Sequence, residues 1–256
     1  MRILCCVKRV PAPGAKINIT ADGQDVDTAH LGFAMSPHEE CAVEEAVQMA
    51  ERFDGEATVL TLGPPEAEEQ LRYAASLGIH NAVLLSTDGS PWDPQRTAAA
   101  IASAIGSLET EGGPFDLILF GNESADSGGY QVGIRVAHAL GRPIVNAIKG
   151  IDPDLDAGTT TAKREIDGGF ELYSLPMPAV LGVKEGLNLP RYPTMKGRLA
   201  SKKIGVKVLE ASADEGGQSR VRLKQPPAVE SNTVKLGDGP EAAPAVVDLF
   251  EELGLM

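Results

Sequence analysis

The chain has 256 residues and a formal net charge of −13 at pH 7; 43% of its residues are hydrophobic and 4% are aromatic. This suits one large α/β domain, or one domain with an appendage, and supplies enough apolar side chains for a full core. The acidic balance argues against nucleic acid as a partner, because phosphate backbones are bound by basic surfaces. The three cysteines include no CxxC pair, so no disulfide framework is expected.

The N-terminal half alternates strand-like and helical segments up to about residue 146. Apolar runs of strand length are separated by segments with apolar residues at helical spacing, which predicts an α/β fold with a doubly wound, mostly parallel, Rossmann-like sheet. The predicted strands are Arg2–Val7, Glu56–Leu62, Asn81–Ser86, Asp116–Gly121 and Pro143–Ala147. The first run is too short for a signal-peptide core or a membrane span, so we expect a cytoplasmic protein without membrane insertion.

Four helices are predicted between these strands. The first begins with a capping box, in which Ser36 is the N-cap and Glu39 lies three residues on. The others are expected at Pro65–Leu77, from Trp92 or Asp93 to Ser107, and from about Gly129 to Leu140.

After residue 146 the pattern changes. The turn Asp167-Gly168-Gly169 predicts an added β-hairpin within residues 160–175, and Pro178–Val183 predicts one more strand. Residues 210–243 are rich in Gly, Pro and Ser, and a short helix around Phe250 follows. We therefore divide the chain into a nucleotide-binding domain, residues 1–209, and an extended C-terminal arm, residues 210–256. The apolar stripe of the last helix can pack on its own domain or on another chain.

Common catalytic and binding motifs are missing. The first βα connection lacks GxGxxG, the chain has no GxxxxGK[ST] loop, and the scattered histidines indicate no metal site. No acid–base constellation indicates an enzyme. The remaining candidate is the Gly- and Ser-rich loop 121–133, which follows the fourth predicted strand and leads into a helix. Open α/β sheets bind ligands there, and a helix N-terminus favours phosphate, although Gly-Gly can also serve as a plain turn.

The run from Val183 to Met195, VKEGLNLPRYPTM, resembles the hallmark segment of electron transfer flavoprotein β subunits. Three further blocks agree with that family in order and spacing: VKRV at residues 7–10, SP at 36–37 followed by AVEEA at 42–46, and REIDGG at 164–169. The resemblance covers nearly the whole chain and is weakest over residues 210–240.

The resemblance implies a doubly wound subunit that binds AMP structurally and forms a heterodimer with an α subunit, which holds the redox-active FAD. A bifurcating branch of the family binds a second FAD in place of AMP. Electrons come from acyl-CoA-type donor dehydrogenases and pass to a membrane quinone reductase. The subunit itself is implied to be an electron carrier rather than an enzyme. It is also implied to dock on the α subunit through the 160–175 hairpin and the C-terminal helix.

Carried over by position, the AMP-contacting residues lie in four segments of the chain. They are Cys6, Ser36, Pro37, His38, Glu39, Leu62, Gly121, Asn122, Glu123, Ser124, Ala125, Asp126, Ser127, Gly128, Gly129, Tyr130, Gln131 and Val132. The chain departs from the family pattern in three respects. Asp126 alone remains of the family's acidic cluster, and Tyr130 replaces an asparagine. His38 stands where many members have an aromatic residue near the flavin, but it can equally be a solvent-exposed residue in the first turn of a helix.

A basic island interrupts the acidic chain. Residues 184–207 carry a balance of +6, so the remainder carries −19. The island coincides with the family's partner-recognition loop, for which we expect an exposed loop with Met195 at its tip. Its residues are Arg191, Tyr192, Pro193, Thr194, Met195, Lys196, Gly197, Arg198, Leu199 and Ala200. Lys202 and Lys203 can equally be the lysines of a protected edge strand.

Two other functions compete with this interpretation. Ser127-Gly128-Gly129 is similar to the SGGxDS loop of ATP-pyrophosphatase ligases, but that loop normally follows the first strand and ends in Asp-Ser. A stand-alone adenine-nucleotide sensor would account for the N-terminal domain and leave residues 191–203 and the arm without a role.

Overall fold

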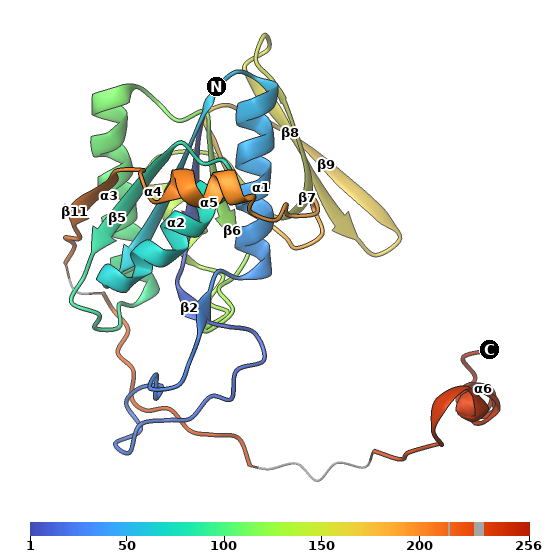
Figure 1. Ribbon diagram of the computed structural model, residues 1–256. Coiled ribbons are helices and arrows are strands. Elements are labelled where there is room, and N and C mark those ends of the chain that lie inside the picture. The colour runs from blue at the N-terminus through green and yellow to red at the C-terminus, as the bar shows by residue number, and fades with distance from the viewer. Residues whose placement is uncertain (215, 228–232) are drawn as a thin grey trace. The chain divides into compact units, whose positions relative to one another are not determined.

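A computed structural model describes residues 1–214, 216–227 and 233–256 (Figure 1). They form two compact units, Met1–Arg222 and Leu223–Met256. The first unit extends beyond residue 210, where we placed the start of the arm. Arg220 lies 3.0 Å from Asp25 in an ion pair, which attaches this part of the chain to the N-terminal loop.

In the described residues the first unit contains a nine-stranded sheet in the order β11-β5-β4-β1-β6-β10-β7-β8-β9. Strands β11 to β7 pair in parallel, and β8 and β9 extend the sheet as antiparallel strands. The predicted fold class is therefore confirmed. The strands are β1 (Arg2–Val7), β4 (Glu56–Gly63), β5 (Asn81–Ser86), β6 (Leu117–Gly121), β7 (Ile144–Asp154), β8 (Thr159–Ile166), β9 (Gly169–Pro176), β10 (Ala179–Val183) and β11 (Val206–Glu210). A separate pair joins β2 (Val10–Pro11) to β3 (Phe33–Ala34).

The direction of the strand order reverses beside β1. Cys6 of this strand pairs with Leu60 of β4 on one side and with Phe120 of β6 on the other. Chain connections leave β1 toward β4 and β5, and then return to β6 on its opposite side. The connections that follow β1 and β6 lead to helices on opposite faces of the sheet, at the edge where open α/β sheets bind ligands.

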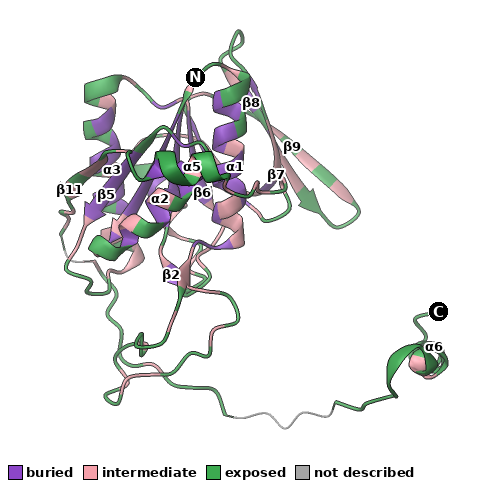
Figure 2. Ribbon diagram, viewed as in Figure 1, coloured by how far each residue is buried: buried purple, intermediate pink, exposed green. Residues whose placement is uncertain are grey.

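Helices cover both faces of this sheet, and the buried residues gather between them (Figure 2). Helices α1 (Pro37–Arg52) and α2 (Glu68–Leu77) share one hydrophobic cluster with the sheet. Helices α3 (Pro94–Gly112) and α4 (Val132–Ala139) share the other. A short 3₁₀ turn, η1 (Pro65–Ala67), precedes α2.

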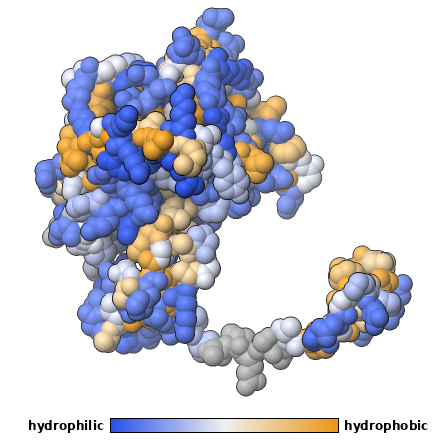
Figure 3. Space-filling view, viewed as in Figure 1, coloured by the Kyte–Doolittle hydropathy of each residue, from blue (hydrophilic) through white to orange (hydrophobic). Residues whose placement is uncertain are grey.

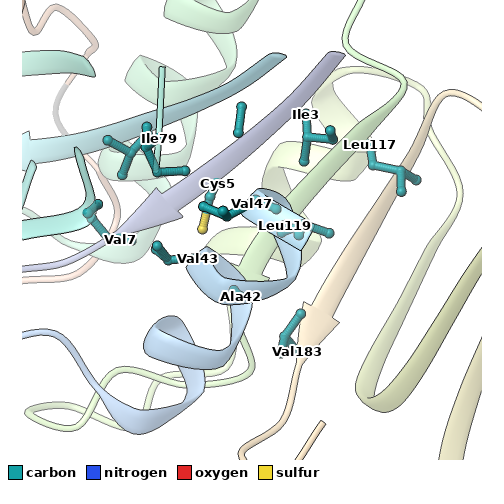
Figure 4. Packing of buried hydrophobic residues seen from close by; sticks show 14 of the residues in the cluster. Ile3, Cys5, Val7, Ala42, Val43, Val47, Ile79, Leu117, Leu119 and Val183 are labelled. Carbon is teal, nitrogen blue, oxygen red and sulfur yellow. The ribbon is translucent and has the colours of Figure 1, made fainter. Parts of the chain in front are cut away.

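The two clusters divide the side chains of β1 between them. Cys5 belongs to the cluster under α1, and Cys6 belongs to the cluster under α3, because successive strand residues point to opposite faces. Figure 4 shows Cys5 beside Val43 and Val47 of α1 and Leu119 of β6. Both faces of the central strand are thus buried, which fixes its position in the sheet.

The predicted helices are present, with changes at their ends. The capping box of α1 is confirmed, since Ser36 and Glu39 bond reciprocally to each other's backbone N–H groups. Asp93 caps α3, which continues five residues beyond the predicted end at Ser107. Helix α4 begins at Val132 rather than at about Gly129. The reason is that Gly128 and Tyr130 adopt left-handed φ angles of 53° and 54°, which a right-handed helix does not contain.

The hairpin is confirmed as the pair β8 and β9, joined through Asp167 and Gly168. Gly168 has a φ of 80°, which favours glycine. Strand β7 is longer than predicted because its second half pairs with β8 beyond the parallel core.

Two segments near the C-terminus are helical. Met195–Ser201 forms helix α5, so the predicted exposed loop at residues 191–200 is wrong in its second half. The reason is that Thr194 caps the segment by accepting a hydrogen bond from the Gly197 N–H at 3.0 Å. The second unit contains the 3₁₀ turn η2 (Gly239–Ala242) and the predicted final helix, α6 (Ala243–Glu252).

Candidate functional site

The candidate nucleotide loop, residues 121–132, starts at the carboxyl end of β6. Its first residues are fixed to neighbouring strands: the Asn122 N–H donates to the Val183 carbonyl at 2.8 Å, and Asn122 Oδ1 accepts from the Ala147 N–H at 2.9 Å. The loop thus begins from a rigid position between β6, β10 and β7.

The middle of the loop is a turn built from small residues. The Gly128 N–H donates to the Ser124 carbonyl at 2.9 Å, and the Ser124 and Ser127 hydroxyls lie 2.8 Å apart. A left-handed backbone at Tyr130 is uncommon for a bulky residue, and such strain concentrates at functional sites.

The loop leads to a helix end with free donors. Gln131 is the N-cap of α4, but its side chain makes no capping hydrogen bond, because Oε1 accepts from Arg135 instead. The first turn of α4 contains no acidic residue. Among the described residues, its N–H groups therefore have no side-chain acceptor, and a helix end of this kind attracts an anion.

Glu39 connects three segments at this edge of the sheet. Its carboxylate accepts the Lys8 N–H at 2.9 Å and the Ser36 N–H at 2.9 Å. A Cβ added to Gly121 would lie 2.6 Å from Glu39 Cγ, so the end of β6 can approach α1 only as glycine. Burial raises the pKa of the Glu39 carboxyl to about 7, although its hydrogen bonds from Ser36 and Lys8 act in the opposite direction.

Two charged contacts reach from these segments to the nucleotide loop. Lys8 Nζ lies 2.6 Å from Asp126, and His38 Nε2 lies 3.4 Å from Glu123 Oε1. Partial burial opposes ionisation of Asp126, but the charge and hydrogen bond of Lys8 hold its pKa below the ordinary value. The Tyr130 hydroxyl also hydrogen-bonds to Glu123, which raises the pKa of Tyr130.

The carried-over AMP positions fall into two groups. Residues 36–39 and 121–132 meet around Lys8, whereas Cys6 and Leu62 lie within β1 and β4. Burial raises the pKa of the Cys6 thiol, so this residue can make a packing contact but supplies no thiolate at neutral pH. Our sequence reasoning missed Lys8 as a site residue. Its position directly after β1, at the carboxyl edge of the sheet, was the available signal.

The candidate partner-recognition segment starts with an internal ion-pair cluster. Arg191 Nε lies 3.0 Å from Glu44, whose side chain is only 3% exposed, and Arg191 Nη1 lies 2.7 Å from Glu51. The hydrogen bonds that Arg191 donates to Glu51 and Glu44 raise the pKa of Arg191 further above its ordinary value. In the described structure, the guanidinium therefore anchors the segment to α1.

Helix α5 rests on α2. The Ser201 carbonyl accepts from Arg72 Nη1 at 2.8 Å, and a Cβ on Gly197 would lie 2.2 Å from the Ser76 carbonyl oxygen. The outer surface presents Met195, which is 75% exposed, Tyr192, which is 91% exposed, and Leu199. Apolar side chains lie among hydrophilic ones on this face of the molecule (Figure 3). The segment is thus a supported platform rather than a free loop.

Comparison with known proteins places the chain in a family. The electron transfer flavoprotein domain model matches residues 25–214. The chain belongs to the electron transfer flavoprotein β-subunit family. The electron transfer flavoprotein subunit beta of Syntrophomonas wolfei is 35% identical over 242 residues, which cover 94% of this chain and 92% of that protein. The protein of the same name from Bacillus subtilis is 29% identical over 98% of this chain and 97% of its own length.

A third relative, protein FixA of Bradyrhizobium diazoefficiens, is 32% identical over 90% of this chain and 80% of its own length. The family resemblance in the sequence is thereby confirmed, and with it the assignment as an electron transfer flavoprotein subunit. No helix in the part of the chain that the structure describes has both the length and the apolar character needed to cross a membrane.

Replacement of Glu39 by Gln should change how stability depends on pH. The folded pKa of about 7 lies above the ordinary 4.5, so the folded state binds this proton more tightly than the unfolded state. The resulting stabilisation is present in acid and is lost as the pH rises through 7. As the pH rises from about 5 to about 8, the free energy of unfolding of Glu39→Gln should increase by roughly 2–3 kcal/mol relative to that of wild type. Urea denaturation at each pH measures this difference. Glu66→Gln, at an exposed residue, is the control, and a pH-independent difference for Glu39→Gln would contradict the prediction.

Replacement of Gly197 by Ala should destabilise the α5 platform. Alanine favours a helix over glycine by about 1 kcal/mol, but its methyl group here meets the Ser76 carbonyl. We expect a net loss of about 1–3 kcal/mol and faster amide exchange at residues 195–201. A Cβ on Gly205 meets no atom within 4 Å, so Gly205→Ala is the matched control. A stabilised Gly197→Ala protein would show that α5 does not rest on α2 as described.

Proposed function

We propose that this electron transfer flavoprotein β subunit binds AMP structurally and forms a heterodimer with an α subunit whose FAD it helps to hold. It thereby carries electrons from acyl-CoA-type dehydrogenases to a membrane quinone reductase. The observation that supports nucleotide binding is the start of α4, near the reversal point of the sheet, where the N–H groups have no side-chain acceptor in the part of the chain that the structure describes. A phosphate there would accept these donors.

The charges around the loop support a nucleotide held by its backbone rather than by basic side chains. Lys8 already pairs with Asp126, and Glu123 faces His38, so these two cationic or protonatable side chains have acidic partners, while Arg135 bonds to the Gln131 amide oxygen. Backbone N–H groups and the helix dipole are then the available donors for phosphate. We assign AMP a structural role, because the described contacts provide no acid–base machinery aimed at a reacting bond.

Two measurements test the nucleotide assignment: the nucleotides released from the complex, and the AMP content of a variant at Gly128. We expect one AMP per β chain and one FAD per heterodimer when the complex, co-expressed with an α-subunit candidate, is denatured and its nucleotides are identified. Gly128 has a φ of 53°, a conformation that β-branched residues avoid, so Gly128→Val should distort the loop. We expect AMP content to fall by at least about half, since such strain costs about 1–3 kcal/mol.

Gly168→Val is the control, because it imposes the same kind of backbone strain in the hairpin turn, away from the loop. It should retain AMP. Unchanged AMP in Gly128→Val would contradict the loop assignment. A second FAD in place of AMP would move the protein to the bifurcating branch.

Two surfaces are proposed for the α subunit. The outer face of the hairpin exposes Phe170 and Leu172, and Lys163 Nζ lies 3.8 Å from the Phe170 ring centre. In the second unit, α6 exposes Val247 and Phe250. Exposed apolar side chains on a sheet edge and on an amphipathic helix are typical of surfaces that another chain covers.

For the donor dehydrogenase we propose α5, with Met195 as an apolar anchor. Lys196 and Arg198 lie beside it and suit attraction to an acidic surface, which increases encounter rate more than affinity. A methionine adapts to differently shaped pockets, which suits a carrier with several donors. The support of α5 by α2 and Arg191 keeps this anchor in a defined place.

Met195→Ala should weaken donor binding by roughly 1–3 kcal/mol, the usual loss for truncating an anchor. Reduction of the complex by its cognate dehydrogenase would show a higher KM for the donor at both low and high salt, with AMP, FAD and the heterodimer retained. Val208→Ala, which shortens another exposed apolar side chain on the edge strand β11, should leave the KM unchanged. Wild-type kinetics in Met195→Ala would refute the anchor.

A further inference from the structure

Residues 185–191 follow α1 as a strap between the nucleotide loop and the α5 platform. The Glu185 N–H donates to His38 Nδ1 at 2.7 Å at the start of α1. One turn further, Asn188 Nδ2 donates to the Cys41 carbonyl at 3.0 Å and to Glu45 at 2.9 Å. Arg191 then pairs with Glu44 and Glu51. Successive contacts are therefore three residues apart in the strap and about one helical turn apart along α1.

The first of these contacts determines which ring nitrogen carries the proton when His38 is neutral. Because Nδ1 accepts a backbone N–H, it carries no proton, and the neutral ring must carry its proton on Nε2. This N–H faces Glu123 Oε1 at 3.4 Å. One imidazole thus contacts the strap with one nitrogen and the nucleotide loop with the other.

The contact between His38 Nε2 and Glu123 in the nucleotide loop can become shorter. The distance of 3.4 Å is longer than an ordinary hydrogen bond, and Glu123 also accepts the Tyr130 hydroxyl from the strained turn. A ligand that orders residues 121–132 would fix the Glu123 carboxylate. A fixed carboxylate orients the imidazole, and the imidazole then holds the Glu185 N–H more firmly.

We propose that His38 is a positioning residue that couples nucleotide occupancy of the loop to the order of the strap and, through Arg191, to the placement of α5. The coupling rests on the proposed nucleotide function. It gives His38 a role in donor recognition although the residue lies at the opposite end of the strap from Met195. Coupling of this kind requires that ligand binding changes the free energy of opening the strap.

Three substitutions separate the two contacts. His38→Phe keeps an aromatic ring and removes both polar contacts. His38→Asn offers an acceptor near the Nδ1 position and can retain the bond to the strap. His38→Gln places its amide near the Nε2 position and can retain the contact with Glu123.

The experiment measures amide hydrogen exchange of residues 184–191 in the co-expressed complex, after nucleotide removal and after addition of AMP alone. In wild type, AMP should slow exchange of the strap roughly five- to tenfold, corresponding to one net hydrogen bond. His38→Phe should exchange roughly five- to tenfold faster than wild type and should not respond to AMP. His38→Asn should restore slow exchange without the response to AMP, and only wild type should show both.

Donor kinetics provide the functional measurement. His38→Phe should raise the donor KM severalfold although Met195 is intact. Strap exchange in wild type that does not respond to bound AMP, or a His38→Phe protein that still responds, would overturn the coupling. Failure of AMP to bind would instead refute the proposed nucleotide function. In that case, equal strap exchange in wild type and His38→Phe would also overturn the positioning role.

Discussion

The carboxylate of Glu39 is the interaction on which the functional edge of this protein depends. It is buried where α1 meets the ends of β1 and β6, and it accepts the backbone N–H groups of Lys8 and Ser36. A buried charge is costly unless it is hydrogen-bonded, and here burial prevails enough to raise its pKa to about 7. The close approach of Gly121 completes the junction and sets the place from which the nucleotide loop departs.

Helix α1 has contacts with both proposed interaction sites. Its first turn faces the nucleotide loop through His38, and its later turns hold Arg191 through Glu44 and Glu51. The buried side of the same helix packs on the central strands (Figure 4). A helix fixed in this way provides a rigid reference for two proposed surfaces that are far apart in the sequence.

Local chemistry made several elements predictable. The capping box at Ser36 and Glu39, the turn at Asp167 and Gly168, and the apolar strands each depend on neighbouring residues alone. The recognition segment was harder. We expected an exposed loop at residues 191–200, but Thr194 caps a helix there, and Gly197 allows a close contact with Ser76. A glycine in a sequence does not reveal whether it serves conformation or close packing.

The sequence by itself determined the doubly wound fold, the glycine loop after β6 and the family, because strand patterning and the run from Val183 to Met195 are local signals. Only the tertiary structure decided which side chains surround that loop. Lys8 is paired with Asp126 across more than a hundred residues, and His38 is placed between Glu123 and Glu185. These contacts arise where the carboxyl ends of separate strands converge, and their partners are set by sheet order, which no local pattern encodes.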